Sequence, residues 1–269
     1  MRIRIVDAFT DRPFSGNPAG VLLLDSFPDD HWLQKVAAEV NLSETAFAHP
    51  LPAGGEADWA LRWFTPSTEV DMCGHATLAT AHVLHTTGLA TGTVRFAARC
   101  GILGATAEDD STITMDFPTS SLTPVPAPDG LAEALGTEVV SVHGTAAHIG
   151  DLVVELRDEA AVRSLDPDFA ALTHLSERGV ITTAAAERPE RGYDFASRCF
   201  FPRVGIDEDP VTGSAHTALA PFWSARLGRD ELTGFQGGAR TGIVRTRLHG
   251  DRTLLTGHAV TVIDGELHA

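Results

Sequence analysis

The sequence is poor in the residues that mark several classes of protein. Its three cysteines, Cys73, Cys100 and Cys199, are too few and too scattered for a disulfide framework or a cysteine-ligated zinc site. Basic residues are also scarce, with 20 Lys and Arg against 36 Asp and Glu and a formal net charge of −16. Such a surface repels phosphate backbones and anionic lipids. We therefore expect a small-molecule partner, no nucleic acid and no membrane.

Long apolar runs are missing as well. The stretch from Ala19 to Leu24 is far shorter than the roughly 20 residues that a membrane span requires. The opening residues, MRIRIVDAFT, alternate as a strand does and lack the apolar centre of a signal peptide. These features predict a cytoplasmic protein. Hydrophobic residues still make up 43% of the chain, which is enough for a sizeable core.

Two helices with almost no polar face dominate the pattern. One begins near Cys73 in DMCGHATLATAHVLHTTG, and the other begins near Gly213 in DEDPVTGSAHTALAPFWSARLG. A more ordinary amphipathic helix follows Asp29 or Asp30 and ends near Asn41. The Pro-rich stretch 117–130 is the best candidate for a linker. Strands are predicted at 21–24, 59–64, 94–98, 112–117, 196–201, 242–248 and 259–263.

The two halves of the chain resemble diverged copies. WFTPSTEVDMCGHATLATA aligns with FFPRVGIDEDPVTGSAHTALA, which places Gly74 on Gly213 and His75 on Ser214. In each copy a strand, a proline, an acidic loop, a glycine and a buried helix follow in the same order. We therefore predict two related domains, 1–117 and 118–269, whose last strand can cross back to the first domain. Coincidence between two Ala-rich helices is the alternative.

The beginnings of these two helices are candidate binding sites. The first turn of a helix leaves backbone N–H groups unpaired, and the helix dipole adds partial positive charge there. A glycine at that position lets a ligand approach the backbone closely. Two such helix N-termini facing one cleft would hold a carboxylate or an enolate-like anion. Otherwise, Gly74 and Gly213 are tight turns only.

Polar side chains lie beside both helix N-termini. His75 follows Gly74, and Asp209 and Ser214 flank Gly213. Glu44 stands in NLSETAF, among apolar neighbours that disfavour its ionised form and so raise its basicity towards that of a general base. Read alone, Glu44 is better explained as a capping residue in a loop.

Four stretches resemble one known family. VDAFTDRPFSGNPAGV, EVNLSETAF, LRWFTPSTEVDMCGHATLA and SRCFFPRVGIDEDPVTGSAHTALAPFW are similar to the PhzF-like family, named for an isomerase of phenazine biosynthesis. The resemblance runs from residue 1 to about 265. It implies an α+β fold of the diaminopimelate epimerase type, with two pseudo-symmetric domains, each a curled, mostly antiparallel sheet wrapped around a central helix. It also implies a homodimer, and no cofactor or metal.

The resemblance assigns roles to the polar residues. Glu44 in NLSET matches the proton-transferring carboxylate of the family. His75 in CGHAT, Asp209 in EDP and Ser214 in TGSA match the residues that hold and polarise the substrate. Glu44, His75 and Asp209 are thus the candidate catalytic residues, and Ser214 is a candidate for substrate binding.

Further candidates for substrate binding come from the same comparison. Gly74 and Gly213 match the glycines at the helix N-termini, and Asn17 in GNPA matches a turn residue near the cleft. Racemising relatives carry a cysteine at each helix N-terminus, whereas this chain has Cys73 at the first and Thr212 at the second. A threonine hydroxyl is too weak an acid for that role, so a two-thiol racemase is not expected. Cys73 is either a packing thiol or a second acid–base group.

The sequence therefore predicts a cofactor-independent isomerase acting on a small carboxylate-bearing metabolite. Glu44 would remove a proton from an activated carbon, and Glu44 or His75 would return it, shifting a double bond or inverting a centre. A non-catalytic metabolite-binding protein is the first alternative. A hydrolase using Ser214, His75 and Asp209 is a weaker one, because GSAH is not the G-x-S-x-G turn that exposes a nucleophilic serine.

Overall fold

The computed structural model describes residues 1–146 and 149–268, which form two compact units. The first unit comprises 1–117 together with 256–269, and the second comprises 118–255. Within the described residues, no helix has the length and apolar character needed to cross a membrane.

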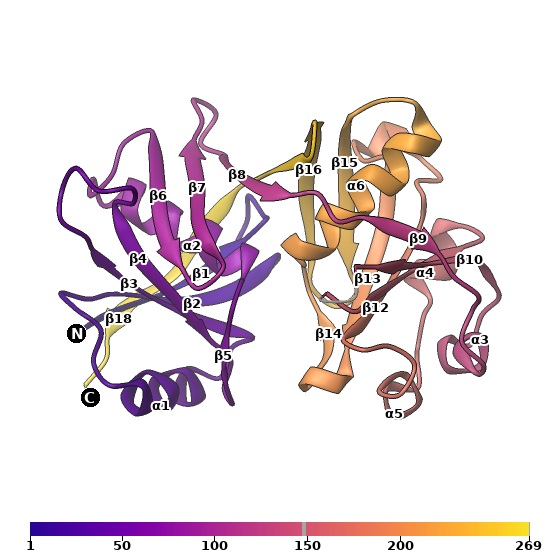
Figure 1. The fold of residues 1–269 in the computed structure, drawn as a ribbon, viewed down its shortest axis with the longest axis horizontal. Coiled ribbons are helices and arrows are strands. Elements are labelled where there is room, and N and C mark those ends of the chain that lie inside the picture. The colour runs from indigo at the N-terminus through magenta and orange to yellow at the C-terminus, as the bar shows by residue number, and fades with distance from the viewer. Residues whose placement is uncertain (147–148, 269) are drawn as a thin grey trace. The chain divides into compact units, whose positions relative to one another are not determined.

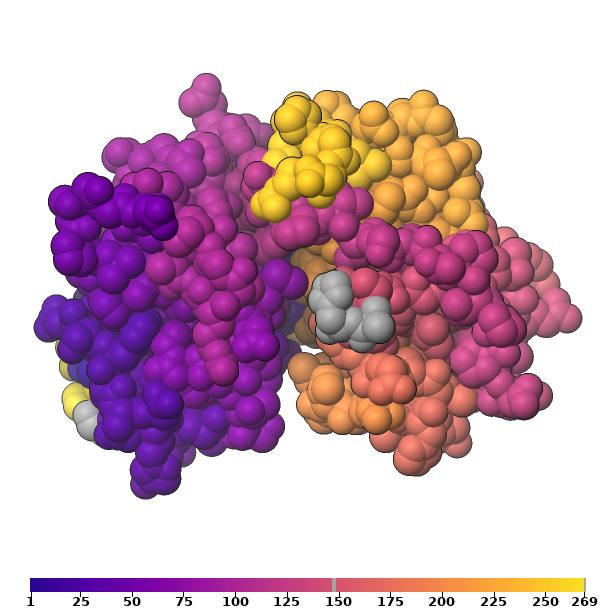
Figure 2. Space-filling view, in the orientation of Figure 1, coloured from indigo at the N-terminus to yellow at the C-terminus, as the bar shows by residue number. Residues whose placement is uncertain are grey.

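The first unit is built on one curled sheet (Figure 1). Its strands are β1 (Arg2–Ala8), β2 (Asn17–Leu23), β3 (Glu44–Pro50), β4 (Trp59–Phe64), β5 (Glu69–Val70), β6 (Thr93–Ala98), β7 (Gly101–Ala107), β8 (Ile113–Pro118) and β18 (Ala259–Glu266). The strands pair in the order β18–β1–β2–β3–β4–β6–β7–β8, parallel at β2–β3 and β4–β6 and antiparallel elsewhere. Because β18 pairs with β1, yellow C-terminal atoms emerge beside indigo N-terminal atoms in Figure 2.

The helix α2 (Gly74–Thr86) is the core of this unit. It contacts β1, β2, β3, β7 and β18, and ten of its thirteen residues are buried. A helix surrounded by sheet needs no polar face, which explains its uniformly apolar sequence. The amphipathic helix α1 (Asp30–Val40) buries Leu33, Val36 and Ala37, and its N-cap, Asp29, accepts a hydrogen bond from the Trp32 backbone N–H.

The second unit repeats this plan. Its strands are β9 (Leu122–Pro124), β10 (Val139–Thr145), β11 (Asp151–Leu156), β12 (Gly179–Ala185), β13 (Phe195–Phe201), β14 (Ile206–Asp209), β15 (Glu231–Gly237), β16 (Thr241–His249) and β17 (Arg252–Gly257). The order is β9–β10–β11–β12–β13–β15–β16, with parallel pairs at β11–β12 and β13–β15. From β10 to β16 the alternation of antiparallel and parallel pairs equals that from β1 to β7. The predicted pseudo-symmetry is confirmed.

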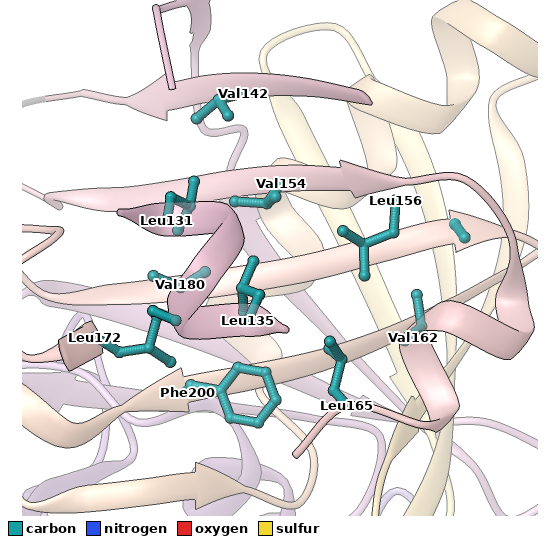
Figure 3. Close-up of a cluster of buried hydrophobic side chains, with 12 residues drawn as sticks. Leu131, Leu135, Val142, Val154, Leu156, Val162, Leu165, Leu172, Val180 and Phe200 are labelled. Atoms are coloured by element: carbon teal, nitrogen blue, oxygen red, sulfur yellow. The ribbon is translucent and has the colours of Figure 1, made fainter. Parts of the chain in front are cut away.

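Both faces of the second sheet are covered. The helix α6 (Gly213–Leu227) packs on one face against Val153, Ile181 and Phe195. The short helices α3 (Leu131–Leu135), α4 (Glu159–Arg163) and α5 (Phe169–Leu172) cover the other face (Figure 3), where the labelled core side chains are Leu131, Leu135, Val142, Val154, Leu156, Val162, Leu165, Leu172, Val180 and Phe200. Burial on both faces explains why β12 and β13 are almost entirely buried.

Local structure departs from the sequence prediction at the Pro-rich stretch. This stretch is not a bare linker, because its strand β9 pairs with β10. Pro221 lies inside α6 and has no backbone N–H to donate to the Thr217 carbonyl. That carbonyl accepts a hydrogen bond from the Ser120 backbone N–H instead.

Candidate active site

The first unit gathers five of the predicted site residues around the N-terminus of α2, where Gly74 is the first helical residue. Cys73 is the N-cap of the helix, in an extended conformation, and His75 is the second helical residue. Glu44 begins β3 and lies opposite Ala19 on β2, the strand that Asn17 begins. The parallel pairing of β2 with β3 thus brings together side chains that are distant in sequence.

His75 is the centre of this cluster. Its Nδ1 lies 3.1 Å from the Asn17 amide nitrogen, and its Nε2 lies 3.3 Å from a carboxylate oxygen of Glu44. An amide nitrogen only donates, so Nδ1 must accept and the ring proton must sit on Nε2. The imidazole therefore donates to Glu44 and orients that carboxylate. Asn17 is fully buried and holds the histidine in this tautomer.

Burial keeps His75 neutral. The side chain is 5% exposed, and desolvation lowers its pKa to about 3. A neutral imidazole serves as a hydrogen-bond donor at neutral pH and carries no second proton to give away.

Cys73 completes the cluster. Its sulfur lies 3.5 Å from His75 Nδ1, and the residue is 6% exposed. The ligand atoms of Glu44, Cys73 and His75 all lie within 4.8 Å of one another, so these three could also hold a thiophilic cation such as Zn²⁺. The thiol contacts the histidine, so Cys73 belongs to the same cluster.

The second unit builds a different cluster at the N-terminus of α6. Thr212 is the N-cap, at the position that Cys73 occupies in the first unit. Its hydroxyl donates a short hydrogen bond to Asp209, and accepts one of 3.0 Å from the Gln236 amide. With both roles fixed, the hydroxyl orients Asp209. Asp209 and Thr212 are each 6% exposed.

Gln236 is a site residue that the sequence did not reveal. It is fully buried on β15, where its Oε1 accepts from the Thr212 backbone N–H at 2.9 Å and its Nε2 donates to the Asp209 carbonyl at 3.0 Å. These bonds fix the loop that leads into α6. The only available signal was its place in the glycine-rich stretch FQGGART, which matches no nucleotide-binding motif.

Ser214 has an arginine as its neighbour. Its hydroxyl accepts a hydrogen bond of 3.1 Å from Arg178, which also forms a 2.8 Å ion pair with Asp151. An arginine stays protonated in proteins and cannot remove the hydroxyl proton. This environment suits a binding residue and gives no support to a nucleophilic serine.

Comparisons with known proteins agree with this architecture. The chain matches the PhzC-PhzF family, described as phenazine biosynthesis-like protein, over residues 6–265. It is 50% identical over 264 residues to an uncharacterized isomerase of Pseudomonas aeruginosa, covering 98% of this chain and 97% of the relative. A crystal structure of a PhzF family protein from Enterococcus faecalis superimposes with a TM-score of 0.91 at 38% identity, covering 100% of this chain and 99% of the other.

A solved structure of much lower sequence identity has the same fold. A probable proline racemase from Agrobacterium radiobacter is 11% identical, with a TM-score of 0.65, and covers 99% of this chain and 92% of the other. The fold is thus the α+β architecture shared with racemases and epimerases. Within that class, the chain belongs to the PhzF-like family of phenazine biosynthesis-like proteins.

Proposed function

We propose that this protein is a cofactor-independent isomerase that moves a proton on a small carboxylate-bearing metabolite. The observation that carries the proposal is the arrangement of Asn17, His75 and Glu44. A carboxylate that is 13% exposed and held by a neutral, tautomer-fixed imidazole is a well-positioned general base. The relative at 50% identity bears the name of an isomerase, which supports the same reaction class.

In the proposed reaction, Glu44 removes a proton from a carbon made acidic by a neighbouring carboxylate, alkene or carbonyl. Backbone N–H groups in the first turn of α2, which have no partner within the helix, stabilise the negative charge that develops. Glu44, now protonated, returns the proton at the same or at another carbon. His75 is not the returning acid, since its low pKa leaves it without an exchangeable second proton at neutral pH.

The second unit would contribute binding. Asp209 and Ser214 are bound by Thr212 and Arg178, respectively. We propose that Asp209 accepts a hydrogen bond from a substrate amine or hydroxyl and that Ser214 donates to a substrate oxygen.

Solvent-deuterium incorporation tests this proposal. The purified protein is incubated in heavy water with amino acids, cyclic dienes and dihydrohydroxyanthranilate-type compounds, and each compound is analysed by mass spectrometry. The active compound should gain deuterium, and Glu44→Gln should slow that gain by about 10²- to 10⁴-fold. Incorporation at the normal rate in Glu44→Gln would remove Glu44 from the mechanism. Tight binding of a compound without any exchange would favour a binding protein instead.

A further inference from the structure

The cluster at the N-terminus of α2 contains three different kinds of metal ligand. Glu44 offers a carboxylate oxygen, Cys73 a sulfur and His75 a ring nitrogen, and these atoms all lie within 4.8 Å of one another. Zn²⁺ is bound in proteins by these three kinds of group. Within residues 1–146 and 149–268, no other group of three or more His, Cys, Asp or Glu has this spacing.

The distances between these atoms are close to those of a tetrahedral site. Bonds of about 2.0 to 2.3 Å to a shared Zn²⁺ place neighbouring ligand atoms about 3.3 to 3.6 Å apart. His75 Nε2 lies 3.3 Å from a Glu44 oxygen and 4.0 Å from the Cys73 sulfur. Movements of about an ångström at the ends of the Glu44 and Cys73 side chains would complete the geometry.

The charges balance when the sulfur is ionised. A helix N-terminus attracts anions and repels cations, so a thiolate is favoured at the N-cap Cys73 and an uncompensated cation is not. One thiolate and one carboxylate neutralise the two charges of Zn²⁺, and binding releases the thiol proton to solvent. A neutral site costs less to bury, which matters because Cys73 is 6% exposed and the His75 side chain 5%.

Asn17 links metal binding to the tautomer of His75. The ring proton occupies Nε2 while the Asn17 amide nitrogen donates to Nδ1 at 3.1 Å. A cation on Nε2 requires this proton to move to Nδ1, where a metal-bound histidine needs a hydrogen-bond acceptor. Rotation of the Asn17 amide presents its oxygen for that purpose. The same two side chains can thus support a hydrogen-bonded state and a metal-bound state.

We propose that Glu44, Cys73 and Nε2 of His75 bind a thiophilic divalent cation such as Zn²⁺, and that the bound cation withdraws Glu44 from proton transfer. Three protein ligands leave the fourth position of the tetrahedron open to water. The Glu44 side chain, 13% exposed, is the most accessible of the three. The binding site is assigned from its geometry alone, whereas the effect on proton transfer rests on the proposed function. The metal-free protein is the active form.

A titration with Co²⁺ tests the site without requiring turnover, because Co²⁺ shares ligands with Zn²⁺ and absorbs light when bound to a thiolate. The full-length protein is dialysed against EDTA and then against chelator-free buffer before Co²⁺ is added. A thiolate-to-Co²⁺ charge-transfer band should saturate at one Co²⁺ per chain. Zn²⁺ should displace the Co²⁺, whereas Mg²⁺ should not, since Mg²⁺ prefers oxygen ligands.

Variants of the ligands identify the site. Cys73→Ser should abolish the charge-transfer band. Glu44→Gln should keep the band and weaken Zn²⁺ binding by about 100-fold, at the upper end of the effect of losing an outer-shell partner. Cys100→Ser is the matched control, because Cys100 is an exposed thiol outside the cluster. It should leave both the band and the Zn²⁺ affinity unchanged.

Asn17→Asp distinguishes this site from simple affinity of a thiol for metal. The new carboxylate would hold the ring proton on Nδ1 and free Nε2 for the cation. Zn²⁺ affinity should therefore rise by about tenfold, within the usual range for a partner of a metal-bound histidine. A substitution that merely loosened the cluster would lower the affinity instead.

The effect on proton transfer is measured on the compound that gains deuterium. Saturating Zn²⁺ should stop the exchange, and EDTA should restore it. Exchange at the normal rate in the Zn²⁺-saturated protein would overturn the proposed effect on Glu44.

The site itself would be overturned by a band that persists in Cys73→Ser, or by equal Zn²⁺ affinity in the native protein, Glu44→Gln and Asn17→Asp. Failure of the proposed function gives a different result: no compound gains deuterium, while the Co²⁺ titration still decides whether the site exists. Absence of Co²⁺ binding would leave the exchange result intact.

Discussion

The two helix N-termini share a backbone and differ in chemistry. Both helices start at a glycine, after an extended N-cap whose side chain does not cap the helix. In the first unit the N-cap Cys73 contacts a histidine that binds a carboxylate; in the second the N-cap Thr212 is bound to Asp209 and Gln236. One copy retains groups that can move a proton, whereas the other has its hydroxyl fixed in a hydrogen-bond network. Divergence of a repeated fold thus separates a proposed catalytic half from a proposed binding half.

Each helix N-terminus contains one buried neutral histidine. We expect both histidines to lower the stability of the fold at acidic pH, and only His75 to affect turnover. Burial lowers the pKa of His75 to about 3 and of His216 to about 4. The unfolded chain binds protons near pH 6.5 and the folded chain does not, so stability present at neutral pH is lost as the pH falls from 6.5 towards these values. The loss should be on the order of 3 kcal/mol for each histidine.

Urea unfolding at pH 7 and pH 4.5 measures that loss. His75→Gln and His216→Gln should each reduce the dependence of the unfolding free energy on pH. His216 Nδ1 donates to the Thr212 carbonyl at 2.9 Å, which is a structural bond. Turnover should therefore drop in His75→Gln and stay within a few-fold in His216→Gln. Equal loss of turnover in both variants would break the contrast between the two helix N-termini.

Asp151 should show the opposite dependence on pH. Its folded-state pKa is raised to about 6, so the folded chain holds a proton that the unfolded chain releases near pH 4. This group therefore destabilises the fold as the pH rises from about 4 to about 6, by roughly 3 kcal/mol at most. The unfolding free energy of Asp151→Asn, relative to the native chain, should increase across that range. A difference that does not change with pH would show that Asp151 ionises normally.

Asn17 tests the fixed tautomer of His75. In Asn17→Asp a carboxylate would attract the ring proton to Nδ1 and leave a lone pair on Nε2, facing the lone pairs of Glu44. A wrong tautomer is costly in catalysis, and we expect kcat to fall by about 10²-fold with KM changed far less. Histidine ¹⁵N chemical shifts report the tautomer directly. Normal kcat with a switched tautomer would exclude the proposed role of Asn17.

Thr212 should have the smallest effect. Thr212→Val removes the hydroxyl that links Asp209 and Gln236, at a cost of about 1 kcal/mol in unfolding free energy. Thr212→Ser restores the hydroxyl and should recover most of that stability. KM should rise in Thr212→Val with kcat nearly unchanged. A large fall in kcat would mean that the second helix N-terminus takes part in proton transfer.

Sequence patterns predicted what depends on local structure. The cap at Asp29, the end of α1 at Asn41 and the buried helices that begin at Gly74 and Gly213 all follow from neighbouring residues. Contacts made across sheet pairs carry no such local signal. Asn17 and His75 are 58 positions apart and meet because β2 lies beside α2.

The second unit also contains contacts that its sequence does not predict. Gln236 reaches Thr212 because β15 runs parallel to β13 in the same sheet, and neither strand's own sequence encodes that pairing. Arg178 and Asp151 meet at the adjoining ends of β11 and β12. Position in a repeated fold identified the residues at the helix N-termini. Gln236, Arg178 and Asp151, which orient residues of the second unit, were found only in three dimensions.

The most direct test of the division between the two units compares Glu44→Gln with Asp209→Asn on the substrate that gains deuterium. Solvent-deuterium incorporation is measured over a range of substrate concentrations for both variants. We predict that Glu44→Gln loses exchange at every concentration while its substrate affinity is retained. Asp209→Asn should need about tenfold more substrate, as expected for one lost hydrogen bond to a charged group, and then exchange at nearly the normal rate. Exchange that persists in Glu44→Gln, or that is absent from Asp209→Asn at saturation, would contradict the account.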